Sequence, residues 1–129
     1  MVNIAIVGAG FIGKVHADAY RQLQNAKLVA VVDNVREKGL QMAREHGAEY
    51  YENLDQCLQE VKEIDNVDIC APTFLHQPLT ALAAENGKNV FCEKPMALSL
   101  DEADQMIEVI EKNKVQGMIG HVLRFWPEY

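Results

Sequence analysis

Runs rich in apolar residues recur along this chain at the length of single strands. They cover residues 2–7, 28–32, 67–71 and 89–92, with a short candidate at 50–51 and a last one at 116–123. Apolar runs of this length, bounded by turn residues, are typical of parallel strands that are buried on both faces. The pattern therefore predicts a parallel sheet built from these segments.

Helical patterns occupy the segments between the predicted strands. They cover residues 11–23, 35–46, 54–61 and 77–85, and a last helix follows Ser99. The first of them carries Ile12, Val15, Ala19 and Leu23 at the spacing of a buried helix face. This spacing predicts that these side chains pack against the sheet.

Residues at the ends of the predicted helices support these boundaries. Asn53 is a favoured N-cap residue, and Ser99 with Glu102 forms a capping box. Gly47 follows the second helix, where glycine commonly ends helices. The alternation of strand and helix predicts one domain over residues 1–129, an α/β fold of the Rossmann type, in which helices cover both faces of a doubly wound parallel sheet.

Composition narrows the class of protein. Hydrophobic residues make up 49% and charged residues 24% of the 129 residues, which is ordinary for a soluble globular chain. The net charge of −7 argues against a nucleic-acid groove or an anionic membrane surface as partner. No apolar run approaches the ~20 residues of a membrane span, and no signal peptide is visible. Cys57, Cys70 and Cys92 form no CxxC motif, so a cytoplasmic location is expected.

A glycine motif lies between the first predicted strand and helix. Gly8, Gly10 and Gly13 form GxGxxG, and Phe11 and Ile12 open the helix that follows. In a dinucleotide-binding fold the first glycine permits a tight turn, the second lets the backbone approach a pyrophosphate, and the third lets helix and strand pack closely. The N–H groups at the start of the helix then face the phosphates.

Asp33 ends the second predicted strand, twenty residues after Gly13. A carboxylate there can accept hydrogen bonds from both hydroxyls of the adenosine ribose and would repel a 2′-phosphate. This favours NAD over NADP. Arg36 leaves an alternative open, because an arginine near this point could pair with a phosphate.

Further motifs follow the later strands. They are Pro72-Thr73-Phe74-Leu75-His76, Glu93-Lys94-Pro95, Gly120-His121 and Arg124-Phe125. In combination they resemble the Gfo/Idh/MocA (glucose-fructose oxidoreductase / inositol dehydrogenase) family over essentially the whole chain. The resemblance implies a Rossmann domain followed by a larger, mostly β domain that binds substrate and mediates oligomerisation. These residues do not include that second domain, so the catalytic aspartate and histidine that it supplies have no counterpart here.

The resemblance also implies roles for single residues. Lys94 would be catalytic, at the point where nicotinamide meets substrate, and Glu93 would lie near the nicotinamide ribose. A lysine there can take the hydroxyl proton or, while protonated, donate a hydrogen bond to the substrate oxygen. His121 and Arg124 would lie close to the substrate cleft.

Other polar residues are placed by the predicted sheet. Pro72, Thr73 and His76 follow the strand at 67–71, at the edge where such folds bind ligands, and are expected to contact the cofactor. The alternative for His76 is a polar residue at the start of the next helix. His16 and His46 lie on predicted helices and are expected in solvent. No group of His, Cys and Asp has the sequence spacing of metal ligands, so no metal is predicted.

These observations predict the NAD-binding domain of an oxidoreductase that transfers a hydride to or from a sugar, polyol or related hydroxyl carbon. The isolated chain is expected to bind NAD(H) without turnover. The alternatives are a stand-alone NAD-binding sensor or scaffold, and another Rossmann dehydrogenase, which Glu93-Lys94-Pro95 disfavours. Leu123, Phe125, Trp126 and Tyr129 crowd the end of the chain and predict a homo-oligomer formed through it.

Overall fold

The computed structural model describes residues 1–128 and contains one six-stranded sheet. The strands are β1 (Val2–Val7), β2 (Ala26–Val32), β3 (Glu49–Tyr51), β4 (Asn66–Ile69), β5 (Asn89–Glu93) and β6 (Gly117–Gly120). All neighbours pair in parallel, in the order β3-β2-β1-β4-β5-β6. The predicted doubly wound α/β fold is confirmed.

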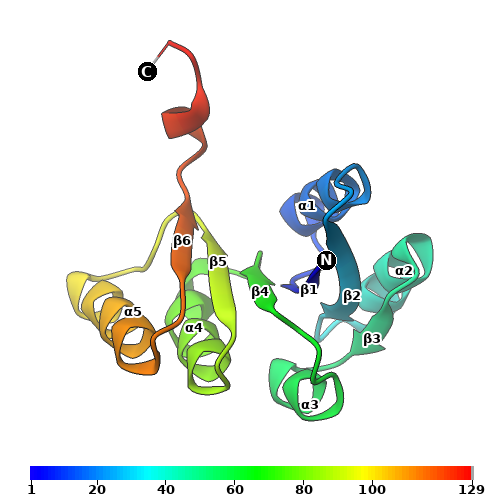
Figure 1. The fold of residues 1–129 in the computed structure, drawn as a ribbon, viewed down its shortest axis with the longest axis horizontal. Helices are drawn as coiled ribbons and strands as arrows, with labels where there is room; N and C mark the ends of the chain where they lie inside the picture. Colours follow the sequence, from blue (N-terminus) through cyan, green and yellow to red (C-terminus); the bar gives the residue numbers. More distant parts are fainter. Residues whose placement is uncertain (129) are drawn as a thin grey trace.

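Helices cover both faces of the sheet (Figure 1). They are α1 (Phe11–Arg21), α2 (Arg36–His46), α3 (Leu54–Glu60), α4 (His76–Glu85) and α5 (Leu100–Asn113), with short 3₁₀ turns η1 (Thr73–Leu75) and η2 (Val122–Phe125). Ala17 of α1 and Met42 of α2 belong to the core on one face. Leu58 of α3, Ala83 of α4 and Met106 of α5 belong to the core on the other.

The strand order reverses between β1 and β4. The chain moves from β1 outward through β2 to β3 and then returns to pair β4 with the other side of β1. Connections that leave two neighbouring strands in opposite directions open a crevice at the carboxyl ends of those strands. The fold therefore places a ligand crevice beyond Val7 and Ile69.

The predicted helix ends are largely confirmed. The Asn53 side chain accepts the Gln56 N–H at 2.9 Å, and the Ser99 hydroxyl accepts the Glu102 N–H at 3.2 Å. Gly47 ends α2 in the left-handed region, with a φ of 67°. These local signals act within one turn of helix, so the sequence alone reveals them.

The predicted buried face of α1 is right only for Ile12, which is half-buried and packs against the core. Val15 and Ala19 are exposed, as is Leu23 beyond the end of the helix, whereas Gly13 and Ala17 are buried. Gly13 approaches the backbone of Gly8 so closely that it sets which side of the helix turns inward. With Gly13 and Ala17 facing the sheet, the side chain of His16, next to Ala17, also turns toward the sheet.

The last strand is shorter than predicted. β6 ends at Gly120, and the Arg124 N–H donates to the His121 carbonyl oxygen at 3.0 Å as the chain turns into η2. β6 is an edge strand, and the residues after it extend away from the sheet (Figure 1). Leu123 and Phe125 are exposed there, Phe125 by 68%. Tyr129 lies outside the described residues.

Candidate functional site

The loop between β1 and α1 needs glycine at two positions for packing reasons. Gly8 has a φ of +108°, and a Cβ on it would stand 2.7 Å from the carbonyl oxygen of Cys70. A Cβ on Gly13 would collide with the carbonyl oxygen of Gly8. Both glycines thus bring the start of α1 close to the ends of β1 and β4.

Gly10 differs from these two glycines. Its φ of −81° and ψ of −165° are open to any residue, and a Cβ on it would meet no atom within 4 Å. The fold itself therefore gives no reason for glycine here. The space beside Gly10 lies directly before α1, whose first N–H groups have no partner inside the helix. This space suits the oxygens of a pyrophosphate.

A cleft of about 750 Å³ opens at this edge of the sheet. Among the predicted cofactor residues it is lined by Gly8, Gly10, Phe11, Ile12, Asp33 and Pro72. Gly13, Thr73, His76, Glu93 and Lys94 are not among its lining residues. The cleft has the size of sites that hold small molecules and cofactors.

Sequence reasoning missed several residues that line the cleft. They are Asn34, Val35, Lys38, Glu52, Asn53, Leu54, Leu75, Leu79 and Phe74. Most of them follow β2, β3 or β4 in the loops at the carboxyl edge of the sheet. The predicted alternation of parallel strands and helices was the signal that could have identified them, because the loops that follow parallel strands lie at one edge of the sheet.

Asp33 is held in place by the backbone around the cleft. Its Oδ2 accepts the Ala9 N–H at 2.7 Å, and its Oδ1 accepts the Val35 N–H at 2.7 Å. The carboxylate is therefore preorganised at the cleft wall, and each oxygen can accept a further hydrogen bond. The Arg36 guanidinium lies 5.7 Å from the centre of the Tyr50 ring, and Arg36 does not line the cleft. This arrangement favours a ribose diol over a 2′-phosphate as the partner of Asp33.

Lys94 lies at the same edge of the sheet, beyond the cleft. It is exposed and follows β5, and its N–H donates to Oε2 of Glu93 at 3.0 Å. The Lys94–Pro95 peptide bond is cis. The side chain of Lys94 is thus free to reach a ligand, while its main chain is tied to the Glu93 carboxylate.

The end of β6 also approaches this point. A Cβ on Gly120 would stand 3.1 Å from Oε1 of Glu93, so the backbone of β6 passes close to that carboxylate. His121 follows at once, and both His121 and Arg124 are exposed. Both residues therefore come directly after β6, the strand that pairs with β5. Their place close to a substrate cleft stays a prediction.

His76 begins α4 and is buried. It is only 1% exposed, and its Nδ1 and Nε2 lie 2.8 Å and 2.9 Å from the carbonyl oxygens of Pro95 and Ala71. Its ring joins the loop after β4 to the turn after β5. Both ring nitrogens thus face main-chain carbonyl groups, and the contact of His76 with a cofactor stays a prediction.

The prediction that His16 and His46 are solvated is wrong. The His16 side chain is 16% exposed and lies between the carboxylates of Asp68 and Glu93. The His46 side chain is 3% exposed, and burial together with Arg21 lowers its pKa. His16 lies on α1 and His46 on α2, and in the packed structure each side chain lies on a side of its helix that is largely shielded from solvent.

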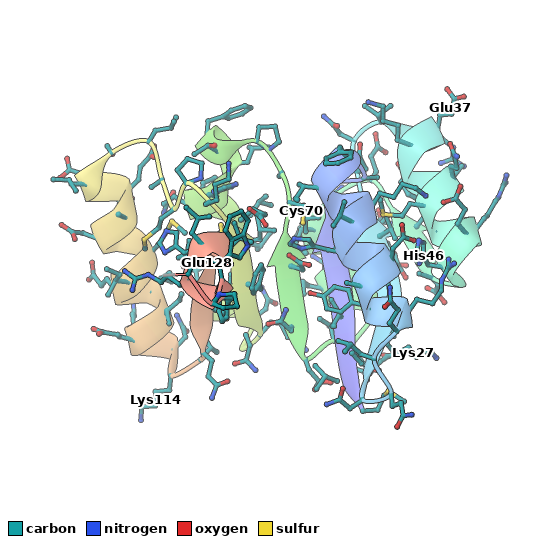
Figure 2. All side chains as sticks on the ribbon, turned by 90° about the horizontal axis from the view of Figure 1, so that it is seen from above. Lys27, Glu37, His46, Cys70, Lys114 and Glu128 are labelled. Carbon is teal, nitrogen blue, oxygen red and sulfur yellow. The ribbon has the colours of Figure 1, made fainter. Side chains whose placement is uncertain are left out.

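Three side chains of ligand type meet beneath the cleft, although their spacing along the chain did not reveal it. His16, Asp68 and Cys70 place ligand atoms within 4.8 Å of one another. Figure 2 shows Cys70 between the end of β4 and α1. Burial and the Asp68 charge raise the pKa of Cys70, which opposes the thiolate that a metal requires. Hydrogen bonds among the three groups account for their positions, and we assign no metal to them.

Within residues 1–128, none of the helices combines the length and the apolar composition that crossing a bilayer requires.

Comparisons with known proteins agree with the fold and with NAD as the cofactor. The family model described as "Oxidoreductase family, NAD-binding Rossmann fold" (GFO_IDH_MocA) matches residues 2–121. The chain is 37% identical over 129 residues to a scyllo-inositol 2-dehydrogenase (NAD(+)) of Bacillus subtilis, covering 99% of this chain and 38% of the relative. It is 36% identical over 125 residues to a 2,7-anhydro-N-acetylneuraminate hydratase of Mediterraneibacter gnavus, covering 97% and 33%.

A solved structure of a similar protein has the same fold as this chain. The crystal structure of scyllo-inositol dehydrogenase from Lactobacillus casei with bound NAD(H) and scyllo-inositol superposes with a TM-score of 0.93 at 32% identity. The match covers 100% of this chain and 38% of that one. The chain therefore spans between 33% and 38% of the length of these relatives.

Proposed function

Because the chain belongs to the Gfo/Idh/MocA oxidoreductase family, with its NAD-binding Rossmann fold, we propose that it is the cofactor-binding part of a dehydrogenase. The reaction is a hydride transfer between NAD and a hydroxyl-bearing carbon of a sugar or polyol. The polyol class is supported by the similar scyllo-inositol dehydrogenases. The observation that carries the proposal is the open space at Gly10, where glycine serves no packing purpose.

The cleft and the neighbouring turn after β5 have separate tasks in this reaction. The backbone around Gly10 and the start of α1 hold the pyrophosphate, and Asp33 accepts the ribose hydroxyls. When NAD is bound, its nicotinamide supplies the hydride acceptor. Lys94 takes or steadies the proton of the substrate hydroxyl. It lies at the carboxyl end of β5, the edge at which the cleft opens.

The 129-residue chain is expected to bind NADH and to show no turnover with sugars or polyols. Binding follows from the preformed cleft, whereas turnover needs a substrate held in register with Lys94, and such positioning is worth many kcal/mol of barrier. Titration calorimetry with NADH and a dehydrogenase screen measure the two properties. Absence of NADH binding, or substantial turnover by the 129-residue chain, would contradict the proposal.

The chain is further expected to associate with a second copy of itself through its C-terminal end. β6 offers an unpaired edge, and the exposed Leu123 and Phe125 follow it directly. Sedimentation velocity compares residues 1–129 with a chain that ends at Gly120. We expect a dimer or larger assembly only for the longer chain. A monomer at high concentration in both cases would rule out this association.

A further inference from the structure

A charged cluster links the glycine-loop helix to the turn that carries Lys94. His16 projects from α1, Asp68 from β4 and Glu93 from β5. His16 Nδ1 lies 2.8 Å from Asp68 Oδ2, and its Nε2 lies 3.0 Å from Glu93 Oε1. Asp68 is 0% exposed. The imidazole ring thus bridges two carboxylates that lie on neighbouring strands of the sheet.

The two contacts of His16 indicate which of its ring nitrogens carry a proton. Ionised carboxylate oxygens only accept hydrogen bonds, so each ring nitrogen of His16 must carry a proton to satisfy both contacts. The hydrogen bond to Asp68 is the largest cause that raises the pKa of His16; burial opposes it, and the negative charges of Asp68 and Glu93 support it. His16 is therefore an imidazolium at the centre of the cluster.

Asp68 is stabilised in the core by further donors. The Tyr20 hydroxyl donates to Oδ2 at 2.8 Å, and the Cys70 thiol donates to Oδ1 at 3.4 Å. Burial, followed by the charge of Asp68, raises the pKa of both donors, so they keep their protons. With these two donors and His16, three side chains contact the buried Asp68 carboxylate, which is thereby held in place and can fix the ring of His16.

Glu93 connects the cluster to the turn that carries Lys94. Oε1 of Glu93 faces His16, and its Oε2 accepts the main-chain N–H of Lys94 at 3.0 Å. His16 lies one helical turn after Gly13, on the helix that begins at the glycine loop. The connection from α1 to the main chain of Lys94 therefore runs through two charge-assisted contacts at Glu93.

We propose that His16, held by Asp68, is a positioning residue: it orients the Glu93 carboxylate and thereby fixes the main chain of Lys94 relative to the helix that faces the pyrophosphate. The inference rests on the proposed function in giving Lys94 a task at the substrate. The connection itself is a property of the free chain and can be measured without substrate.

The first test is a pH titration of the wild-type chain by NMR. The side chains that face His16 are Asp68, Cys70 and Glu93, with the Phe91 ring 5.6 Å away in an edge-to-face contact. Loss of the His16 proton removes the Nε2–H donor to Glu93. We expect the Lys94 amide resonance to shift with the same midpoint as the His16 ring, above the ordinary pKa of histidine near 6.5. A Lys94 amide resonance whose chemical shift does not change as His16 titrates overturns the inference.

The second test uses His16→Gln, with Lys14→Gln as control. Lys14 lies on the same helix as His16, and its Nζ pairs with Glu45 of α2 at 2.9 Å on the surface. Hydrogen exchange at the Lys94 N–H is expected to accelerate about tenfold in His16→Gln and less than about twofold in the control. Equal exchange in both variants overturns the inference. If His16→Gln does not fold, Asp68→Asn replaces it, with the same expected acceleration.

The pH dependence of stability has a defined sign. A histidine whose pKa is raised in the folded state stabilises the fold below its unfolded pKa, near 6.5, and loses this contribution as the pH rises through the folded value. The unfolding free energy of the wild-type chain should therefore fall above pH 6.5 by more than that of His16→Gln. These measurements use no cofactor. A failure of NADH binding would count against the proposed function alone.

Discussion

Gly10→Ala is expected to weaken NADH binding at least about tenfold while changing the unfolding free energy by less than about 1 kcal/mol. The added methyl group meets no protein atom within 4 Å and sits on a backbone conformation that alanine adopts. It would occupy the space through which a pyrophosphate reaches the first N–H groups of α1. Calorimetry with NADH and urea unfolding measure the two quantities.

Gly13→Ala is the matched comparison and, unlike Gly10→Ala, is expected to lose stability. Its Cβ would collide with the Gly8 carbonyl oxygen, so α1 must move away from the end of β1. Overpacking of this kind costs about 1–3 kcal/mol of stability or more. If Gly10→Ala binds NADH as tightly as the wild type, the glycine loop does not hold the pyrophosphate and the carrying observation of the proposed function is lost.

The contrast between these two glycines shows what the sequence could predict. The GxGxxG spacing, Asp33 after the second strand and the caps at Asn53 and Ser99 are all local signals, and the structure places each in the expected element. The parallel sheet with helices on both faces follows from the alternation of strands and helices. The fold and the wall of the cleft were therefore within reach of the sequence.

The cluster around His16 could not be predicted in the same way. His16 is separated from Asp68 by 52 positions and from Glu93 by 77. The apolar spacing of α1 pointed to the wrong face, because Val15 and Leu23 are apolar yet exposed. Which side of α1 turns inward is decided by the contact of Gly13 with Gly8, a tertiary effect that periodicity does not contain. The burial of His76 escaped prediction for a similar reason, since its partners are carbonyl groups of two separate loops.

Asp33→Ala is expected to weaken NADH binding by on the order of 100-fold and NADPH binding by less. Two hydrogen bonds from ribose hydroxyls to a charged acceptor are lost, each worth about 1.5–3 kcal/mol. The Ala9 and Val35 N–H groups also lose their acceptor, which loosens the glycine loop for either cofactor. The repulsion of a 2′-phosphate disappears with the charge, so the preference for NADH over NADPH narrows.

Asp33→Asn separates the charge from the shape of this side chain. It keeps one acceptor oxygen at the cleft wall and removes the negative charge, so NADPH should gain relative to NADH while the loop stays closer to its wild-type state. Arg36→Ala completes the set, because the Arg36 guanidinium rests on the Tyr50 ring outside the cleft and should leave both affinities nearly unchanged. Fluorescence titration with each cofactor gives the three ratios. Tighter binding of NADPH than of NADH by the wild-type chain, lost in Arg36→Ala, would show that Arg36 rather than Asp33 sets the cofactor preference.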